Sequence, residues 1–194
     1  MSIVTPDTFQ RYRILSIDPG LNNTGCSIYE IEHSQSSILS IQSFTLQNDK
    51  LKNNIPLDLE FYPERMVKLY KLKQALTEVI QHYQPALVVC ESPFYNRFRP
   101  MAYGALLEVL SIIQSSLLSF NINIPFYTVE PLLIKKTVGA GMMKGKLDVK
   151  EAVRRIPSIM NVLQNSLDDL DEHAIDSIAV GYTFLKVRGG FNHV

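Results

Sequence analysis

The sequence contains only two cysteines among its 194 residues, Cys26 and Cys90. Each lies inside an apolar, strand-like run, and the two are far from a CxxC spacing. Zinc sites built from cysteine need closely spaced thiols, so this pattern argues against a zinc protein. We expect two buried, reduced thiols that pack as small apolar side chains.

No excess of charge is present, because 19 lysines and arginines balance 19 aspartates and glutamates. A net charge of zero gives no indication of nucleic-acid binding. The net charge can, however, hide segments of strongly positive or negative charge. The segment 135–155 carries a charge of +5 and the remainder carries −5. This asymmetry predicts a basic, substrate-facing rim beside an acidic centre, although a solvated basic helix is the commoner explanation for such a segment alone.

Apolar runs of membrane-spanning length, a secretory leader, internal repeats and low-complexity tracts are also missing. These absences predict a soluble, intracellular protein without membrane contacts. A chain of 194 residues, 46% of them hydrophobic, suits one α/β core and is too short for two full catalytic domains. We therefore expect one domain over residues 1–194, with 1–10 as a flexible N-terminal arm.

Hydrophobic patterning predicts an α/β fold that opens with an antiparallel meander. Three short apolar runs, 13–18, 26–32 and 38–46, are separated by turns rich in Asn, Gly and Ser. Helical spacing follows over 63–83, and the run 86–91 has the unbroken apolar character of a strand buried on both faces. A strand that follows a crossover helix is normally parallel to its partner, so the expected sheet is mixed.

The remaining segments are expected to alternate between irregular structure, helix and strand. The expected elements are a loop at 47–61, a long helix at 101–120 that supplies core and subunit contacts, a strand at 124–129, a short helix at 131–138, a helix starting near 148 and a final helix at about 170–188.

Asp18 is the first candidate functional residue. It stands at the end of the first expected strand, immediately before the turn Pro19-Gly20. A carboxylate held by rigid backbone and facing a polar turn suits a metal or phosphate site. Asp-Pro-Gly is also good turn chemistry in any protein, so Asp18 alone leaves both interpretations open.

Three further side chains form a constellation with Asp18. Glu91 ends the central strand, and neighbouring strands would place it beside Asp18 although 73 residues separate them. His173 and Asp176 are three residues apart on the last expected helix, so they share one face. Each residue has an alternative interpretation when it is considered alone. Glu91 could form a structural ion pair with an arginine, and His173 could be a polar surface residue.

Crowded carboxylates repel one another unless a cation neutralises them. Oxygen ligands suit Mg²⁺ or Mn²⁺, and two such ions provide a known route to phosphodiester hydrolysis. Imidazole is a less natural Mg²⁺ ligand than carboxylate. A separate acidic run at the start of the last helix is explained by the helix dipole and is left out of the site; it comprises Asp168, Asp169, Asp171 and Glu172.

Three motifs occur together in a fixed order: Ile-Asp-Pro-Gly-Leu at 17–21, Val-Val-Cys-Glu-Ser-Pro-Phe at 88–94 and Asp-Glu-His-Ala-Ile-Asp-Ser-Ile-Ala at 171–179. With this combination the chain resembles RuvC-type Holliday junction resolvases, over almost all of residues 13–187. These proteins are endonucleases of the ribonuclease H-like superfamily, and viral members would suit the compact chain. The resemblance implies a ribonuclease H-like fold, with a mixed central sheet flanked by helices.

The resemblance also assigns roles to the constellation. Asp18, Glu91 and Asp176 fall on the family's carboxylate ligands, and His173 falls where members use either Asp or His. The implied cofactor is Mg²⁺, or Mn²⁺, at two ions per active site. Because one ligand position holds imidazole, the metal preference and the role of His173, as ligand or in proton transfer, stay open.

The resemblance further implies a DNA-binding surface. Phe94 matches an aromatic that members place against bases at the junction centre, and stacking is plausible for unpaired bases. Its alternative is a core phenylalanine, although the polar and basic residues around it favour an exposed loop. Lysines near the basic segment would contact phosphates and make binding salt-dependent. The full set of candidates is Phe94, Arg97, Arg99, Lys135, Lys136, Lys144, Lys146 and Lys150, with Lys135 a firmer match than Lys146, which Lys144 could replace.

The expected function is therefore a metal-dependent endonuclease that resolves four-way DNA junctions by paired symmetric nicks. Cutting two strands requires two active sites, which implies a symmetric homodimer. One alternative is another nuclease of the same fold, acting on other branched DNA or on RNA–DNA hybrids. A second is a junction-binding module without catalysis, which the complete acidic set disfavours. A third, an actin-like or sugar-kinase-like ATPase, would need a longer chain with a second Gly-rich phosphate loop.

Overall fold

The computed structural model describes residues 11–33, 36–51, 61–95, 97–98, 100–141 and 148–188. The expected N-terminal arm, 1–10, lies outside these residues, as does 52–60, which is most of the expected loop 47–61.

A five-stranded mixed sheet forms the centre of the protein, with the strand order β3-β2-β1-β4-β5. β1 (Arg11–Asp18), β2 (Asn23–Glu32) and β3 (Ser37–Gln47) form the predicted antiparallel meander. β4 (Leu87–Glu91) pairs parallel to β1, and β5 (Phe126–Val129) pairs parallel to β4. The mixed α/β sheet expected from the sequence is confirmed.

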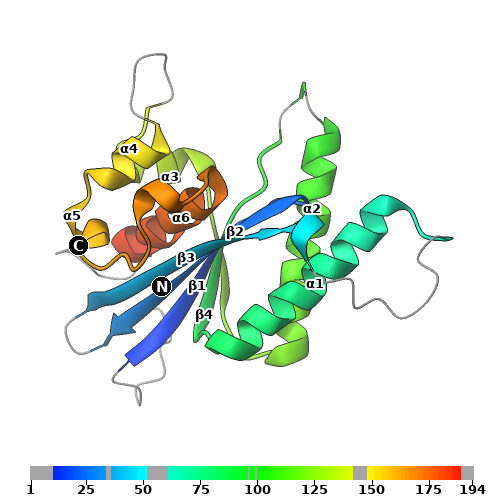
Figure 1. Cartoon of the computed structure of the whole chain (residues 1–194), viewed down its shortest axis with the longest axis horizontal. Helices are drawn as coiled ribbons and strands as arrows, with labels where there is room; N and C mark the ends of the chain where they lie inside the picture. The colour runs from blue at the N-terminus through cyan, green and yellow to red at the C-terminus, as the bar shows by residue number, and fades with distance from the viewer. Residues whose placement is uncertain are drawn as a thin grey trace.

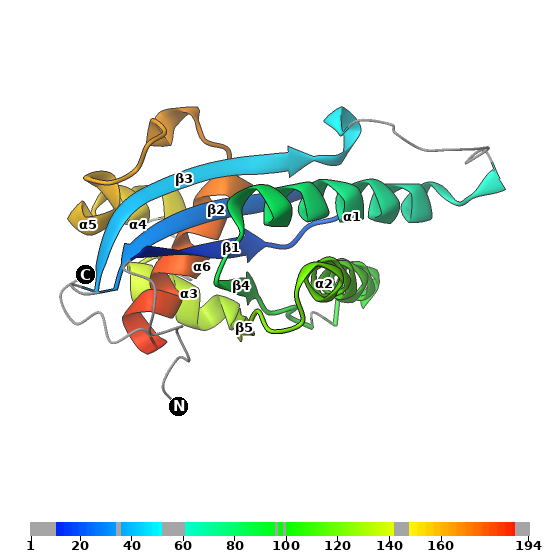
Figure 2. The same cartoon turned by 90° about the horizontal axis from the view of Figure 1, so that it is seen from below.

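Helices cover both faces of the sheet (Figures 1 and 2). One face packs against α1 (Glu64–Tyr83) and α2 (Pro100–Phe120). The opposite face packs mainly against α6 (Glu172–Arg188). Around α6 lie the shorter helices α3 (Pro131–Val138), α4 (Val149–Arg154) and α5 (Pro157–Met160).

The alternation of side chains along β1 builds two separate cores. Leu15 and Ile17 point to the α1/α2 side, whereas Ile14 points to the α6 side. Each is 1% exposed or less. Asp18 follows Ile17 in this alternation and therefore belongs to the α6 face.

Both cysteines lie in the core that faces α1 and α2. Cys26 and Cys90 are free thiols with no exposed surface, as the sequence predicts. Burial raises the pKa of both thiols above the ordinary value, which keeps them protonated.

Helix boundaries agree with the sequence where capping signals are present. α3 begins at Pro131 and ends before Gly139, which adopts a left-handed conformation with φ of 81°. Asp148 caps α4 by accepting a hydrogen bond from the amide of Glu151 at 2.8 Å. Pro63 caps α1 rather than starting it.

Short elements were missed by the sequence prediction. α5 has four residues, and 3₁₀ turns occur at Asn48–Lys50 and Leu167–Asp169. Such pieces are too short to produce a recognisable hydrophobic period.

No apolar run long enough to span a membrane was expected from the sequence, but α2 meets the criteria of length and composition for one. By length and composition alone it could cross a membrane, and only 22% of its most apolar window is buried. Serines and a glutamine interrupt its apolar runs without lowering the mean hydropathy of that window below 1.5. Length and composition are weak criteria, because apolar helices that pack against other surfaces also meet them.

Candidate active site

The carboxylates of Asp18 and Glu91 mark the C-terminal ends of two adjacent parallel strands. Ile17 in β1 is paired with Cys90 in β4, so the next residue of each strand is an acid. Both acids follow the side-chain alternation to the α6 face. The carboxyl ends of parallel strands are a common place for ligand sites in α/β proteins.

The first turn of α6 lies against these strand ends. Asp171 caps the helix by accepting a hydrogen bond from the amide of Ala174 at 2.9 Å, and it also accepts one from the hydroxyl of Thr45 in β3 at 2.5 Å. The predicted structural role of Asp171 is therefore confirmed. Gly25, paired with Asp18, makes the close approach possible, because an added Cβ atom would overlap the carbonyl of His173.

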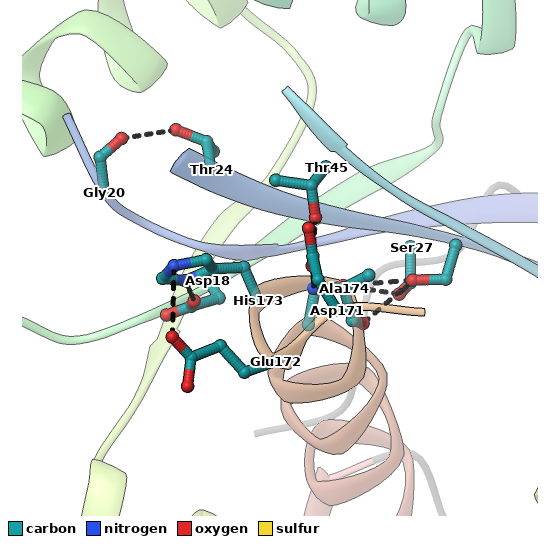
Figure 3. A network of polar contacts seen from close by, with 11 residues as sticks. Asp18, Gly20, Thr24, Ser27, Thr45, Asp171, Glu172, His173 and Ala174 are labelled. Atoms are coloured by element: carbon teal, nitrogen blue, oxygen red, sulfur yellow. Dashed lines mark hydrogen bonds and ion pairs between the residues drawn. The ribbon is translucent and has the colours of Figure 1, made fainter. Parts of the chain in front are cut away.

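His173 contacts Asp18 directly (Figure 3). Its Nδ1 atom lies 2.9 Å from Oδ2 of Asp18, and its Nε2 atom lies 3.8 Å from Oε1 of Glu172. The hydrogen bond to Asp18 raises the pKa of His173. His173 is thus part of the acidic cluster and not an isolated surface residue.

The three carboxylates share one electrostatic environment. Burial, followed by repulsion from Asp18 and then Asp176, raises the pKa of Glu91 to about 8. Burial and repulsion from Asp18 likewise raise the pKa of Asp176 to about 7. Burial also raises the pKa of Asp18, because it outweighs the hydrogen bond from His173.

The charge balance of this cluster suits a bound cation. Within the described residues, the one ion pair made by Asp18, Glu91 or Asp176 is that between Asp18 and His173. No arginine pairs with Glu91 in the part of the chain that the structure covers, contrary to the structural alternative. Carboxylates that lack a lysine or arginine partner among the described residues are hard oxygen donors that fit a divalent metal ion such as Mg²⁺ or Mn²⁺.

The side chains of the acidic cluster are not arranged as a metal coordination shell in the described part of the structure. Among the described residues, no three His, Cys, Asp or Glu side chains stand in a metal-ligating arrangement. One oxygen of Asp18 faces the imidazole of His173. The assignment of Asp18, Glu91, His173 and Asp176 as ligands therefore stays a prediction, supported by chemistry and electrostatics.

Phe94 and its neighbours lie beyond the end of β4 on an exposed segment. Phe94 is 69% exposed, in agreement with the expected exposed loop. Arg97 is also exposed, and its guanidinium lies 4.7 Å from the centre of the Phe98 ring. Arg99 lies outside the described residues.

The predicted lysines divide into three groups. Lys135 and Lys136 are exposed on α3, and the charge of Lys135 acts on both Glu91 and Asp176 by lowering their pKa values. Lys150 instead makes an ion pair with Asp168 at 3.4 Å. Lys144 and Lys146 lie outside the described residues.

Ion pairing also accounts for part of the basic segment. Arg154 contacts Asp168 at 2.6 Å and Glu151 at 3.1 Å, so Asp168 stabilises α4 rather than the acidic cluster. Among the described residues of the basic segment, Lys135 on α3 is the one whose charge acts on Glu91 and Asp176.

Polar contacts around the site were not predicted from the sequence. Thr24 closes the turn after Asp18 by donating to the carbonyl of Gly20 at 2.6 Å, and Lys68 on α1 donates to Asn22 at 3.1 Å. The sequence does not indicate which partner a serine or threonine hydroxyl in a strand will bond, because these residues are equally common at solvent-facing positions.

The strand order β3-β2-β1-β4-β5 and the crossover through α1 form the ribonuclease H-like fold expected from the sequence. The sequence model of "Crossover junction endodeoxyribonuclease RuvC" matches residues 14–184. The chain therefore belongs to the RuvC family of crossover junction endodeoxyribonucleases.

Individual relatives agree with this assignment. The RuvC protein of Prochlorococcus marinus (strain MIT 9301) is 28% identical over 180 residues, which cover 93% of this chain and 99% of the relative. The structure titled "T. thermophilus RuvC in complex with Holliday junction substrate" matches with a TM-score of 0.61 and 16% identity, covering 92% of this chain and 96% of that one. The yeast mitochondrial Holliday junction resolvase matches with a TM-score of 0.64 and 14% identity, covering 90% and 78%. These structural matches support the fold.

Proposed function

We propose that this protein binds four-way DNA junctions and cuts two opposing strands by symmetric nicks, using two divalent metal ions at each active site. The observation that carries the proposal is the buried cluster of Asp18, Glu91 and Asp176, which lacks an arginine or lysine ion pair among the described residues. Family membership supplies the reaction class, and the metal dependence expected of that class agrees with the cluster.

The proposed ligands are Asp18, Glu91, Asp176 and His173. When bound, Mg²⁺ or Mn²⁺ lowers the pKa of an attacking water and stabilises the leaving 3′-oxygen. The carboxylates would hold the ions from two strand ends and one helix, and the pairing of β1 with β4 fixes the backbone separation of Asp18 and Glu91. His173 acts either as a ligand or as a proton carrier through its Nδ1 contact with Asp18. The products carry 5′-phosphate and 3′-hydroxyl ends.

DNA binding is proposed to use the exposed segment after β4 and the basic face of α3. Phe94, which is exposed, would stack on an unpaired base near the junction centre, and Arg97 would add positive charge to the same segment. Lys135 and Lys136 would contact phosphates beside the acidic cluster. Arg99, Lys144, Lys146 and Lys150 remain candidates for the same role.

Two coordinated nicks need two active sites, so we propose a symmetric homodimer. The exposed side of α2 suits the subunit contact, because Leu107 is 41% exposed and Leu118 is 58% exposed on that helix. Burying such side chains is favourable by roughly 25 cal/mol per Å² of apolar surface. Leu118→Glu should shift the protein from dimer to monomer in analytical ultracentrifugation, whereas a wild-type monomer at micromolar concentration would contradict the dimer.

The decisive experiment compares an end-labelled mobile four-way junction with a linear duplex, a flap and an RNA–DNA hybrid. Each substrate is incubated with Mg²⁺, Mn²⁺ or EDTA. Symmetric nicks that are confined to the junction and abolished by EDTA are the expected result.

The other outcomes separate the alternatives. Efficient cutting of the flap or the hybrid would move the function to another nuclease of the same fold. Junction binding without cutting under either metal would leave a non-catalytic binding module. Cleavage of the junction in the presence of EDTA would contradict the metal-dependent mechanism.

A further inference from the structure

Three buried serines form one row across the sheet directly beneath α6. Ser16 in β1 is paired with Ser27 in β2, and Ser27 is paired with Ser43 in β3. None is more than 2% exposed. Ser177 on α6, which is fully buried, completes the group, and we call these four residues the serine cluster.

The hydroxyl groups of the serine cluster link the helix to all three strands. Ser27 Oγ lies 2.9 Å from Ser43 Oγ and 2.6 Å from Ser177 Oγ. Ser43 Oγ donates to the carbonyl of Ala174 at 2.8 Å, and Ser16 Oγ donates to the carbonyl of Ser177 at 2.8 Å. Figure 3 shows Ser27 beside the start of α6, close to Ala174.

One arrangement of the protons satisfies every member. Ser177 donates to Ser27, Ser27 donates to Ser43, and Ser43 donates to the carbonyl of Ala174, while Ser16 donates to the carbonyl of Ser177. The chain of bonds starts on α6, passes through two strands and returns to α6. Ser16 and Ser43 each have a second acceptor within the sheet at 3.3 Å, the carbonyls of Ser27 and Cys26, and Ser177 has one within α6 at 2.7 Å, the carbonyl of Ala174. The bonds from Ser16 and Ser43 to α6 are shorter, at 2.8 Å, so the docked position of the helix gives these two buried hydroxyls their better partners.

Neighbouring rows of the sheet extend this contact along the helix. The row Asp18–Gly25–Thr45 faces the first turn of α6. On the other side, Tyr29 donates from its hydroxyl to the carbonyl of Ile178 at 2.5 Å. The serine cluster lies between these two rows, in the middle of the contact between α6 and the antiparallel strands.

We infer that the serine cluster positions α6 so that Asp176 and His173 meet Asp18 and Glu91, and that the cluster thereby sets the metal-binding geometry of the site. Asp176 directly precedes Ser177, and His173 directly precedes Ala174, so both site residues adjoin anchored positions. Ser16 lies two residues before Asp18 on the same face of β1. These serines are positioning residues, since they act through the helix and not on the substrate.

The inference deepens the proposed function and rests on it. Ser27→Ala is the direct test, because Ser27 connects the strands to Ser177 and its replacement breaks both links. Misplacement of catalytic groups by up to 1 Å costs on the order of 10- to 100-fold in rate, so we expect a loss of kcat in that range. Junction affinity measured in EDTA should stay at the wild-type value, since the DNA-contacting residues lie elsewhere.

Thr183→Val is the matched control. Thr183 lies on the same helix, has no exposed surface, and its hydroxyl has no hydrogen-bond partner in the described structure. This variant removes a buried hydroxyl of α6 without breaking a bond, so kcat should be unchanged. An equal loss of kcat in Thr183→Val and Ser27→Ala would overturn the inference.

A second readout without DNA separates this inference from the proposed function. Mn²⁺ should raise the Tm of the wild-type protein and of Thr183→Val, and the rise should be smaller in Ser27→Ala. Absence of any Mn²⁺ effect on the wild type would reject the metal site itself. A full wild-type response in folded Ser27→Ala would reject the positioning role alone.

Ser16→Ala serves where Ser27→Ala does not fold. Ser16 makes one bond to α6, so this variant removes a single anchor and retains the Ser27 links. It should likewise lower kcat and the Mn²⁺ response. Wild-type values for both quantities in Ser16→Ala would overturn the inference in that case.

Discussion

Nδ1 of His173 lies 2.9 Å from Oδ2 of Asp18, although 155 residues separate the two along the chain. The contact joins the first strand of the sheet to its last helix. It forms because Gly25, beside Asp18 in the neighbouring strand, leaves room for the backbone of α6. A single pair of side chains therefore reports whether the sheet and α6 are correctly docked.

Asp18→Asn and Glu91→Gln should each abolish junction cleavage and preserve junction binding. Both changes remove a proposed ligand charge with little change in shape, and the DNA-binding residues are unaffected. Gel electrophoresis for cleavage and fluorescence anisotropy for binding provide the measurements. Asp169→Asn, which alters an exposed acid outside the cluster, is the control. Full activity in either ligand variant would remove the two-metal assignment.

His173→Asp should retain Mg²⁺-dependent cleavage, whereas His173→Ala should lose most of it. A carboxylate replaces imidazole as an oxygen donor and suits Mg²⁺ better, so the ratio of activity in Mg²⁺ to activity in Mn²⁺ should increase. Rates measured in each metal over a range of concentrations test this. Unchanged rates in His173→Ala would show that the ring is neither ligand nor proton carrier.

Phe94→Ala should slow junction processing while the metal site stays intact. Removing a base-stacking aromatic costs about 1–3 kcal/mol, which corresponds to roughly 5- to 150-fold in junction affinity or rate. The Mn²⁺-induced rise in Tm should match that of the wild type. Ile122→Ala is a suitable control because Ile122 is also exposed but precedes β5, at the opposite end of the sheet. Equal effects of both variants would argue against stacking by Phe94.

Lys135→Ala should weaken junction binding and reduce its dependence on salt. Each phosphate contact contributes a slope of about −0.9 in log K against log[salt], so the loss of one contact should lower the magnitude by about one unit. Arg11→Ala removes the same charge from the start of β1, away from the acidic strand ends, and should leave the slope unchanged. An unchanged slope in Lys135→Ala would exclude a phosphate contact.

The metal-free protein should lose stability as the pH rises from about 5 to about 8. Glu91 and Asp176 have pKa values raised to about 8 and about 7, so the folded state binds more protons than the unfolded state in this interval. Stability therefore decreases with rising pH there. Mn²⁺ should raise the Tm more at pH 8 than at pH 5. In Glu91→Gln the decline of Tm should be smaller, and an undiminished decline would show that Glu91 does not cause it.

Much of the fold was predictable because the decisive signals are local. The unbroken apolar run before Glu91 identifies a central strand, and Pro131 with Gly139 delimits α3. By contrast, α5 contains only one turn, which produces no helical period. The exposed apolar surface of α2 agrees with the helix expected at 101–120 to supply both core and subunit contacts, whereas the particular side chains left exposed depend on what packs against the helix.

The candidate site was predictable as a set of residues but not as a geometry. Asp18 and Glu91 end apolar runs, and the spacing of His173 and Asp176 indicates a shared helix face. The hydrogen bond between His173 and Asp18 depends on the docking of α6, which no local pattern encodes. Ser16, Ser27 and Ser43 were missed for the same reason, since their common row appears only when the strand register is known.

The position of α6 at the end of the order of elements has a consequence for synthesis. A ribosome makes β1 to β5 first, so Asp18 and Glu91 reach the sheet while His173 and Asp176 are still being translated. The sheet also lacks the cover of α6 on one face until that point. The newly made protein therefore gains its complete acidic cluster only after α6 has been synthesised, and a chain that still lacks α6 has an incomplete site.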